Sequence, residues 1–335
     1  MVQFAVRTRE VVTVDVLFIL GMPRSGTKLL RDILNRHPEV AIFPVESHFL
    51  PYFQSRFPQY GDISQRSNFD RFYADVQQTN FMRALSERDI HFPADEWFAS
   101  LQGNSFGSAI ESLFAIYAGR SGSRIAGDKT PAYITEAELL LDLFPNAKFV
   151  HIVRDPRDYV LSLRNAWNQN AIRAAQRWKD SIRNLHAVMK ARHIEYAEIR
   201  YEDLVSDPRA AVTRVCDYLG IDFDETMLNF DRPTENIGDA KGALGVVSKN
   251  FGKWRHSLRA PEVHAIEAIA GVMIDSLGYE LYGQAGDRDA SRVYLRIARL
   301  QDTWNRFRFI YRDEKSLTGA FRRIGRTARF RVRNG

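Results

Sequence analysis

The chain has 335 residues, of which 45% are hydrophobic and 26% charged, a composition that excludes a wholly disordered, collagen-like or coiled-coil protein. Its single cysteine, Cys216, excludes an intramolecular disulfide and a cysteine-cluster metal site, and it suits a reducing, cytoplasmic setting. The net charge of +6 is uneven: residues 286–335 hold fourteen Lys or Arg and five Asp or Glu, which leaves −3 on the rest and argues against a nucleic-acid partner.

The chain opens with a strand, a loop and a helix. Residues 14–20 form an apolar run that is typical of a buried parallel strand and too short to span a bilayer. A helical pattern starts near Thr27, after the loop at residues 21–26, and residues 40–43 read as a second strand. The insert at residues 51–123 has a mainly helical pattern, and most of its aromatic side chains are expected to lie in the core.

The second half of the body alternates strands and helices. Strand-like runs at residues 148–153 and 195–200 are each followed by a helical pattern, the first of them opened by Pro156. The other expected helices cover residues 132–144, 173–192, 208–219 and 261–277. Strands separated by helices predict a parallel sheet covered on both faces. We therefore expect a P-loop-like, three-layer α/β domain at residues 1–285, with the helical insert inside it, and a basic tail at residues 286–335.

The loop at residues 21–26 carries the strongest functional signal. Gly21 and Gly26 permit a tight loop whose backbone N–H groups point inward, and the following helix offers further N–H groups at the positive end of its dipole. The side-chain donors beside them are Arg24, Ser25, Thr27 and Lys28. Together they predict a site for an oxyanion such as phosphate; the alternative is a glycine-rich turn without a ligand.

The same loop is similar to a Walker A motif but ends differently. Gly26 is followed by Thr27 and then Lys28, whereas a nucleoside triphosphatase needs the lysine first, on the phosphates, and then a hydroxyl on magnesium. The sequence also shows no clear magnesium-binding carboxylate at the end of a strand. A P-loop kinase or nucleoside triphosphatase is therefore kept as the disfavoured alternative.

A second anion site is predicted where the strand at residues 148–153 ends. Arg154 follows this strand, and Ser162 lies on the helix after it, so the two could clamp one phosphate with a forked charged pair and a neutral hydrogen bond. Both loops would meet at the carboxyl ends of the strands. The alternative for this turn, and our interpretation of its other charged residues, is a helix-capping cluster of salt bridges formed by Asp155, Arg157 and Asp158.

Residues 23–27, Pro-Arg-Ser-Gly-Thr after an apolar strand, resemble the 5′-phosphosulfate loop of the sulfotransferases that use 3′-phosphoadenosine 5′-phosphosulfate (PAPS). The segment from Arg154 to Ser162 is similar to the 3′-phosphate region of that family. Lys28 stands where the family has Ser or Thr, so it either supplies a charge or is a solvated helix residue. The donor-binding residues that the resemblance implies are Arg24, Ser25, Gly26, Thr27, Lys28, Arg154, Ser162, Tyr201 (against the adenosine) and Lys253 (on a late basic-aromatic loop).

The resemblance also implies catalytic residues. Pro131 stands where the cytosolic branch of the family has its basic histidine, whereas Glu46 stands where the tyrosylprotein and related bacterial branches have a glutamate base. Glu46 would work best as a base if burial raised its pKa, and His48 is the second candidate. Lys129, helped by Arg24, is expected to stabilise the leaving oxygen. Asp128 is expected to orient Lys129 or to bind the acceptor.

These residues predict an enzyme that moves a sulfuryl group from PAPS to a hydroxyl of a glycan, a lipid or another small acceptor, leaving adenosine 3′,5′-bisphosphate (PAP). No metal is expected, because a sulfuryl group carries less charge than a phosphoryl group, and positioning and electrostatic stabilisation supply most of the rate. The third hypothesis is a noncatalytic binding protein that keeps the nucleotide fold.

The tail is expected to have two parts. Val293, Ile297, Leu300 and Trp304 suit one face of a helix that could pack on the body. From Phe321 onward, six arginines alternate with apolar residues and no acid. This last segment could be a solvated, disordered end or could lie on an anionic membrane surface, which would make the protein cytoplasmic with a peripheral membrane contact. The sequence leaves the oligomeric state open.

Overall fold

The fold is built around one parallel β-sheet. The computed structural model describes residues 14–230, 242, 245–248 and 250–314. Its five strands stand in the order β2-β3-β1-β4-β5, and each neighbouring pair is parallel. The strands are β1 (Asp15–Leu20), β2 (Val40–Ile42), β3 (Ile125–Asp128), β4 (Lys148–Val153) and β5 (Ala197–Arg200). The predicted α/β class and parallel sheet are therefore confirmed.

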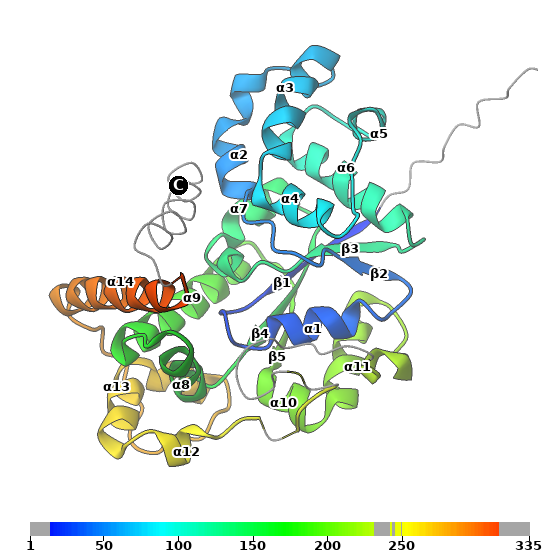
Figure 1. Cartoon of the computed structure of the whole chain (residues 1–335). Coiled ribbons are helices and arrows are strands. Elements are labelled where there is room, and N and C mark those ends of the chain that lie inside the picture. Colours follow the sequence, from blue (N-terminus) through cyan, green and yellow to red (C-terminus); the bar gives the residue numbers. More distant parts are fainter. Residues whose placement is uncertain (1–13, 231–241, 243–244, 249, 315–335) are drawn as a thin grey trace, which may run out of the picture.

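Helices cover both faces of this sheet (Figure 1). Because successive strand side chains alternate, Leu17 and Ile19 of β1 face one layer and Phe18 faces the other. The first layer consists of α1 (Thr27–Leu34), α10 (Tyr201–Ser206) and α11 (Pro208–Leu219). Helices that pack in the second layer include α7 (Ala137–Leu143), α8 (Pro156–Trp167), α9 (Ala171–Ala191) and α13 (Ala260–Ser276). Strands that are apolar on both sides demand this double cover, so the three predicted layers are present.

The insert between β2 and β3 is helical, as expected, and forms one group of helices in Figure 1. Its members are α2 (Leu50–Arg56), α3 (Arg66–Gln77), α4 (Asn80–Ser86), α5 (Ala94–Ala99) and α6 (Phe106–Gly119). Phe53, Phe69, Phe72 and Trp97 are buried among them, and several of their rings meet edge to face. Trp97 donates its indole N–H to the carbonyl oxygen of Ala109 at 2.8 Å. The expectation that these aromatic side chains belong to the core is confirmed.

Shorter elements complete the chain. They are the 3₁₀ turns η1 (Phe57–Tyr60), η2 (Pro131–Thr135) and η3 (Glu225–Leu228) and the helices α12 (Trp254–Ser257) and α14 (Arg292–Glu314). Cys216 is buried in α11, where burial raises the pKa of its thiol to about 11. The single cysteine is therefore a core residue. Within the described part of the chain, no helix combines the length and the apolar character that crossing a bilayer requires.

Helix α14 is confirmed, but its expected packing is wrong. Ala298 and Asp302 face the body and are buried, whereas Val293, Ile297, Leu300 and Trp304 are 60% to 72% exposed. The Asp302 carboxylate accepts hydrogen bonds from the backbone N–H of Asn170 at 2.7 Å and from Arg173 at 2.6 Å. This polar contact fixes the rotation of the helix and turns its apolar face outward. The basic segment that begins at Phe321 lies outside the described residues.

Gly107 marks a close contact between α6 and the end of α7. A Cβ atom at this position would lie 2.3 Å from the carbonyl oxygen of Leu143, whereas a Cβ at Gly119, on the same helix, meets none of the described atoms within 4 Å. We predict that Gly107→Ala lowers the free energy of unfolding by about 2 kcal/mol or more, because the backbone must shift. Gly119→Ala should change it by about 1 kcal/mol or less. Urea unfolding followed by circular dichroism measures both, and equal effects would contradict the prediction.

Candidate active site at the carboxyl edge of the sheet

All five strands end at one edge of the sheet, and residues predicted for the site follow each of them. The loop at residues 21–26 comes after β1, Glu46 after β2, Lys129 after β3, Arg154 after β4 and Tyr201 after β5. Because ligands of open α/β sheets bind beyond the carboxyl ends of the strands, this edge is the candidate active site.

The loop after β1 turns sharply into α1. Arg24 and Gly26 have φ angles of 74° and 88°, in the left-handed region, which costs the arginine about 1 kcal/mol. Gly26 is the N-cap of α1 and has no side chain to bond the free N–H groups of the first turn. Ser25 is buried, and its Oγ has no hydrogen-bond partner among the described residues. These unpaired groups fit an oxyanion at the positive end of the helix.

Tyr201 packs directly on this loop. A Cβ atom at position 26 would lie 2.4 Å from Cδ2 of the Tyr201 ring, so the close contact requires glycine there, as does the positive φ. The Tyr201 hydroxyl accepts a hydrogen bond from Nδ2 of Asn250 at 2.9 Å. Thr27 is buried at the start of α1, and Lys28 is half-buried on the same turn. The loop is thus shaped by β5 as well as by its own glycines.

Arg154 connects the two predicted anion sites. Its Nη1 donates to the backbone carbonyl of Arg24 at 2.9 Å, and its guanidinium lies 4.5 Å from the centre of the Tyr201 ring, a cation–π distance. Arg24 in turn donates from Nε to Oγ of Ser162 at 3.2 Å. The Nε of Arg154 is buried and has no hydrogen-bond partner in the described part of the chain. The segments that the sequence presents 130 residues apart therefore meet.

The late basic-aromatic loop joins the same group through Asn250. Arg154 donates from Nη2 to the carbonyl oxygen of Asn250 at 3.2 Å, and Nζ of Lys253 donates to Oδ1 of Asn250 at 2.7 Å. Asp158 accepts a hydrogen bond from the backbone N–H of Trp254 at 3.0 Å and so holds this loop near α8. The sequence alone does not single out Asn250, although it lies on the same basic-aromatic loop as Lys253.

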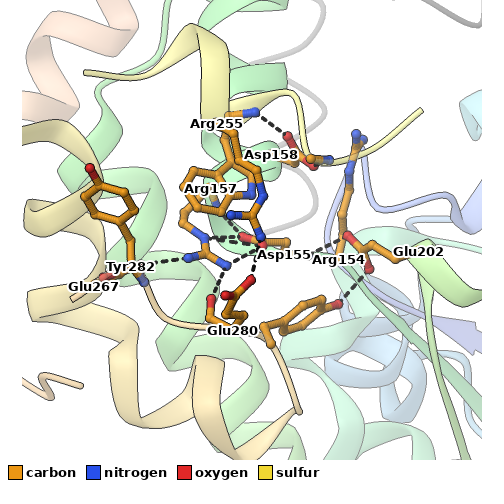
Figure 2. Close-up of polar contacts among 12 residues, drawn as sticks. Arg154, Asp155, Arg157, Asp158, Glu202, Arg255, Glu267, Glu280 and Tyr282 are labelled. Carbon is orange, nitrogen blue, oxygen red and sulfur yellow. Dashed lines mark hydrogen bonds and ion pairs between the residues drawn. The ribbon is translucent and has the colours of Figure 1, made fainter. Parts of the chain in front are cut away.

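The other charged residues of the β4–α8 turn form a structural cluster, which Figure 2 shows. Asp155 caps α8 and accepts hydrogen bonds from Nε and Nη2 of Arg157, whose Nη1 donates to Glu267 at 2.7 Å. Arg157 lies 3.8 Å from the ring centre of Trp254. The Arg154 side chain stands apart from this group in Figure 2. The helix-capping interpretation is confirmed for Asp155 and Arg157.

Glu46 and Lys129 form an ion pair at the ends of β2 and β3. Nζ of Lys129 donates to Oε1 of Glu46, and Nε2 of His48 lies 2.9 Å from Oε2. Burial opposes the ionisation of Glu46, but the hydrogen bond with His48 and the charge and hydrogen bond of Lys129 outweigh it and lower the pKa of Glu46 to about 2. The rise in the pKa of Glu46 that would make it a better base is therefore absent in this arrangement, because Lys129 and His48 both stabilise its ionised form.

A buried polar network that sequence reasoning missed holds the two segments together. The Ser47 hydroxyl donates to Asp128 and lies 2.7 Å from the Tyr133 hydroxyl, and the backbone N–H of Ser47 donates to Oγ1 of Thr130 at 2.9 Å. Ser47 is the residue after Glu46, and Asp128 and Thr130 flank Lys129. The network therefore positions the ion pair.

A carboxylate, Asp128, does end β3, and its contacts decide whether it could bind magnesium. Its two oxygens accept hydrogen bonds from Ser47 and Thr130, and the side chain is fully buried. Burial raises the pKa of Asp128 to about 6, and these hydrogen bonds only partly oppose the rise. The carboxylate is therefore engaged by the protein and is not presented to a magnesium ion.

A His–Glu–His cluster lies away from the strand ends, with His151 on β4, Glu198 on β5 and His186 on α9. Glu198 Oε2 is 2.8 Å from His151 Nδ1 and 2.7 Å from His186 Nε2. These three atoms could approach one metal ion. However, His151 Nε2 is buried without a partner among the described residues, and a metal on Nδ1 would force a proton onto it. The cluster fits a neutral His151 that donates to Glu198, in agreement with burial lowering the pKa of His151.

The buried carboxyl of Asp128 predicts a pH-dependent difference in stability. Its pKa of about 6 lies above the ordinary 3.8, so the folded state keeps a proton that the unfolded state releases. The contribution of Asp128 to the free energy of unfolding therefore falls as the pH rises from about 4 to about 6. Relative to the wild type, the free energy of unfolding of Asp128→Asn should rise by up to about 3 kcal/mol as the pH rises through this window. Urea unfolding of both proteins at several pH values measures this difference. A difference that does not change with pH would refute the shift.

The chain is similar in sequence to known proteins of one family. A model of the sulfotransferase family matches residues 16–225. The nodulation protein NoeE of Sinorhizobium fredii is 24% identical over 325 residues, which cover 86% of this chain and 73% of that protein. Protein-tyrosine sulfotransferase A of Caenorhabditis elegans is 26% identical over 226 residues, 64% of this chain and 52% of that protein.

A solved structure is also similar. The sulfotransferase domain of the olefin synthase from Synechococcus PCC 7002 matches 82% of this chain and 98% of that domain, with 25% identity and a TM-score of 0.52. The family match spans β1 to β5, and so includes every strand whose end contributes to the candidate site. This chain belongs to the sulfotransferase family and is a transferase enzyme.

Proposed function

We propose that the chain moves a sulfuryl group from PAPS to a hydroxyl of a glycan, a lipid or another small acceptor. The observation that carries this proposal is the hydrogen bond from Arg24 Nε to Ser162 Oγ at 3.2 Å. It joins the loop assigned to the 5′ end of the donor to the segment assigned to its 3′-phosphate. A ligand with anionic groups at both ends, as PAPS has, matches a paired site of this kind.

The fit of the donor rests on two buried polar atoms. Ser25 Oγ and Arg154 Nε have no hydrogen-bond partners among the described residues, and such atoms cost free energy that ligand oxygens would recover. In our proposal, residues 24–28 and the N-terminus of α1 hold the 5′-phosphosulfate. Arg154 and Ser162 hold the 3′-phosphate, Tyr201 lies against the adenosine, and Lys253 meets a phosphate.

The acceptor is activated by Glu46. The acceptor oxygen attacks the sulfur of the bound donor in line with the leaving phosphate oxygen, so that a new O–S bond forms as the bond from sulfur to that phosphate oxygen breaks and PAP leaves. Glu46 accepts the proton of the acceptor hydroxyl, while Nζ of Lys129 and the guanidinium of Arg24 offset the charge of the leaving oxygen. The low pKa of Glu46 keeps it ionised and ready to accept a proton throughout the physiological range, although it also makes the carboxylate a weak base.

Glu46 and Lys129 must part for both to act. Their ion pair occupies the Glu46 oxygen that would take the acceptor proton and the Lys129 ammonium that would meet the leaving oxygen. When Lys129 turns to the leaving oxygen, Glu46 loses one of the two partners that lower its pKa, and its basicity rises. The network of Ser47, Asp128 and Thr130 keeps the two backbones in place during this exchange.

The acceptor remains to be identified by experiment. The name of the C. elegans relative assigns protein tyrosine to that enzyme. In this chain the helical insert begins shortly after Glu46, so its residues could line a pocket for a different acceptor. Transfer of labelled sulfate from PAPS into a cell extract, followed by identification of the labelled product, would name the acceptor class.

Donor binding gives the first test. We predict that the chain binds PAP, the product, in calorimetric titration, and that it binds ATP with magnesium far more weakly, since the only carboxylate that ends a described strand is engaged. Arg154→Ala should weaken PAP binding by about tenfold to a hundredfold through loss of charge-assisted hydrogen bonds. Arg164→Ala on α8, the helix that follows Arg154, is the matched control, since Arg164 pairs with Glu262. Preference for ATP with magnesium would favour a kinase or nucleoside triphosphatase instead.

The base gives the second test. We predict that Glu46→Gln lowers kcat about 10²- to 10⁴-fold while PAP binding changes little, because the amide cannot take the acceptor proton. His48→Ala is the matched control on the same loop, and it should keep most of the turnover. Steady-state rates of sulfate transfer and PAP titrations on both variants distinguish the roles. Full turnover in Glu46→Gln would reject Glu46 as the base, and loss of turnover in His48→Ala alone would assign the role to His48.

A further inference from the structure

Helix α14 presents an apolar row to solvent. Val293, Ile297, Leu300 and Trp304 recur at helical spacing and are 60% to 72% exposed. The half-buried Phe307 continues the row, and its ring stacks on that of Trp304 with centroids 5.7 Å apart. We call these five residues the apolar row. A contiguous exposed row of large apolar side chains marks a surface that binds something.

The row is held outward by contacts on the opposite side of the helix. Ala298 and Asp302 are buried against α8 and α9, and Asp302 forms an ion pair with Arg173 at 2.6 Å. Tyr294 and Asn305 make further hydrogen bonds, to Asn170 and to the carbonyl of Asn168. Rotating the helix to bury the apolar row would break all of these, so the orientation is a stable property of the fold.

The exposed side chains beside the apolar row are basic. Arg292, Arg296, Arg299 and Arg308 are all exposed on α14. Between residues 292 and 308 the one acidic residue is Asp302, which is buried and paired with Arg173. Between these positions the solvent-facing side of the helix therefore combines apolar and aromatic side chains with cations and carries no compensating anion. The helix ends with Arg312, Asp313 and Glu314, and residues 315–335 of the sequence hold seven Lys or Arg and no acid.

This combination selects the partner. A second copy of the chain would set arginine against arginine, and five side chains cover far less than the roughly 800 Å² per partner that a standard protein interface needs. An anionic lipid surface satisfies both features, because acyl chains cover the apolar side chains while lipid phosphates meet the arginines. Trp is favoured at the level of the headgroups.

We propose that α14 docks the protein on the surface of an anionic phospholipid membrane. The helix lies in the plane of the interface, with the apolar row in the boundary of the acyl chains and the arginines at the lipid phosphates. In Figure 1, α14 lies on the side of the molecule toward which β1 ends. Docking through this helix would hold the carboxyl edge of the sheet near the membrane, where an acceptor carried by a lipid would be reached in two dimensions.

The test uses the full chain and sedimentation with vesicles of phosphatidylcholine, either alone or mixed with phosphatidylglycerol. We expect binding to the mixed vesicles that weakens with added salt, and little binding to the neutral ones. Leu300→Glu combined with Trp304→Glu should weaken the binding about tenfold or more. Val272→Glu combined with Tyr282→Glu, which adds the same charge at exposed apolar positions off α14, should bind like the wild type.

Three results would overturn the proposal. One is wild-type chain that stays in the supernatant with mixed vesicles. Another is binding by the Leu300→Glu/Trp304→Glu variant that equals wild-type binding, which would assign the contact to residues 315–335. The last is a wild-type dimer in solution that this variant dissociates, which would assign the apolar row to a second copy. Trp304→Phe gives an independent readout, since a blue shift of tryptophan emission on mixed vesicles should disappear in it while binding persists.

Discussion

The candidate site depends on one constraint, namely that the five strands run in the same direction. Parallel strands deliver their carboxyl ends, and whatever follows them, to one edge of the sheet. This brings Glu46 and Tyr201, which are 155 positions apart, to the same rim. The body of the chain carries a slight excess of acid, so its affinity for an anion cannot come from its overall charge. In our proposal it comes from a few cations and backbone N–H groups that the strand ends bring to one place.

Two of the three proposed catalytic groups, Glu46 and Lys129, form an ion pair with each other in the structure described. An ammonium paired with a carboxylate attracts an anionic donor less strongly than a lone ammonium, and the carboxylate is a weaker base than a lone one. Lys129 therefore helps to keep Glu46 ionised, and in our proposal the pair opens once the anionic donor attracts the lysine. The hydroxyl network behind the pair involves no side chain that must move, so the exchange is confined to the two side chains.

Local patterns were enough to predict the strands, the loop after β1 and the turn at Arg154. A strand buried on both faces leaves a continuous apolar run, as at residues 14–20, and the donors of the loop are consecutive in the chain. The contact of Ser47 with Asp128 had no such signal, because it exists only once the ends of β2 and β3 are neighbours. The rotation of α14 was misjudged for a related reason. Its apolar spacing is real, but the ion pair of Asp302 with Arg173 decides which face turns inward.

The bond from Arg154 to the carbonyl oxygen of Arg24 has a thermodynamic consequence. A residue assigned to one end of the donor stabilises the backbone of the loop assigned to the other end, so the two halves of the site cannot be ordered independently. Two separate fragments, each carrying one anionic group, would bind with positive cooperativity, and linkage requires each to raise the affinity of the other by the same factor. In the proposed binding mode, recognition of the two ends of the donor is one coupled equilibrium.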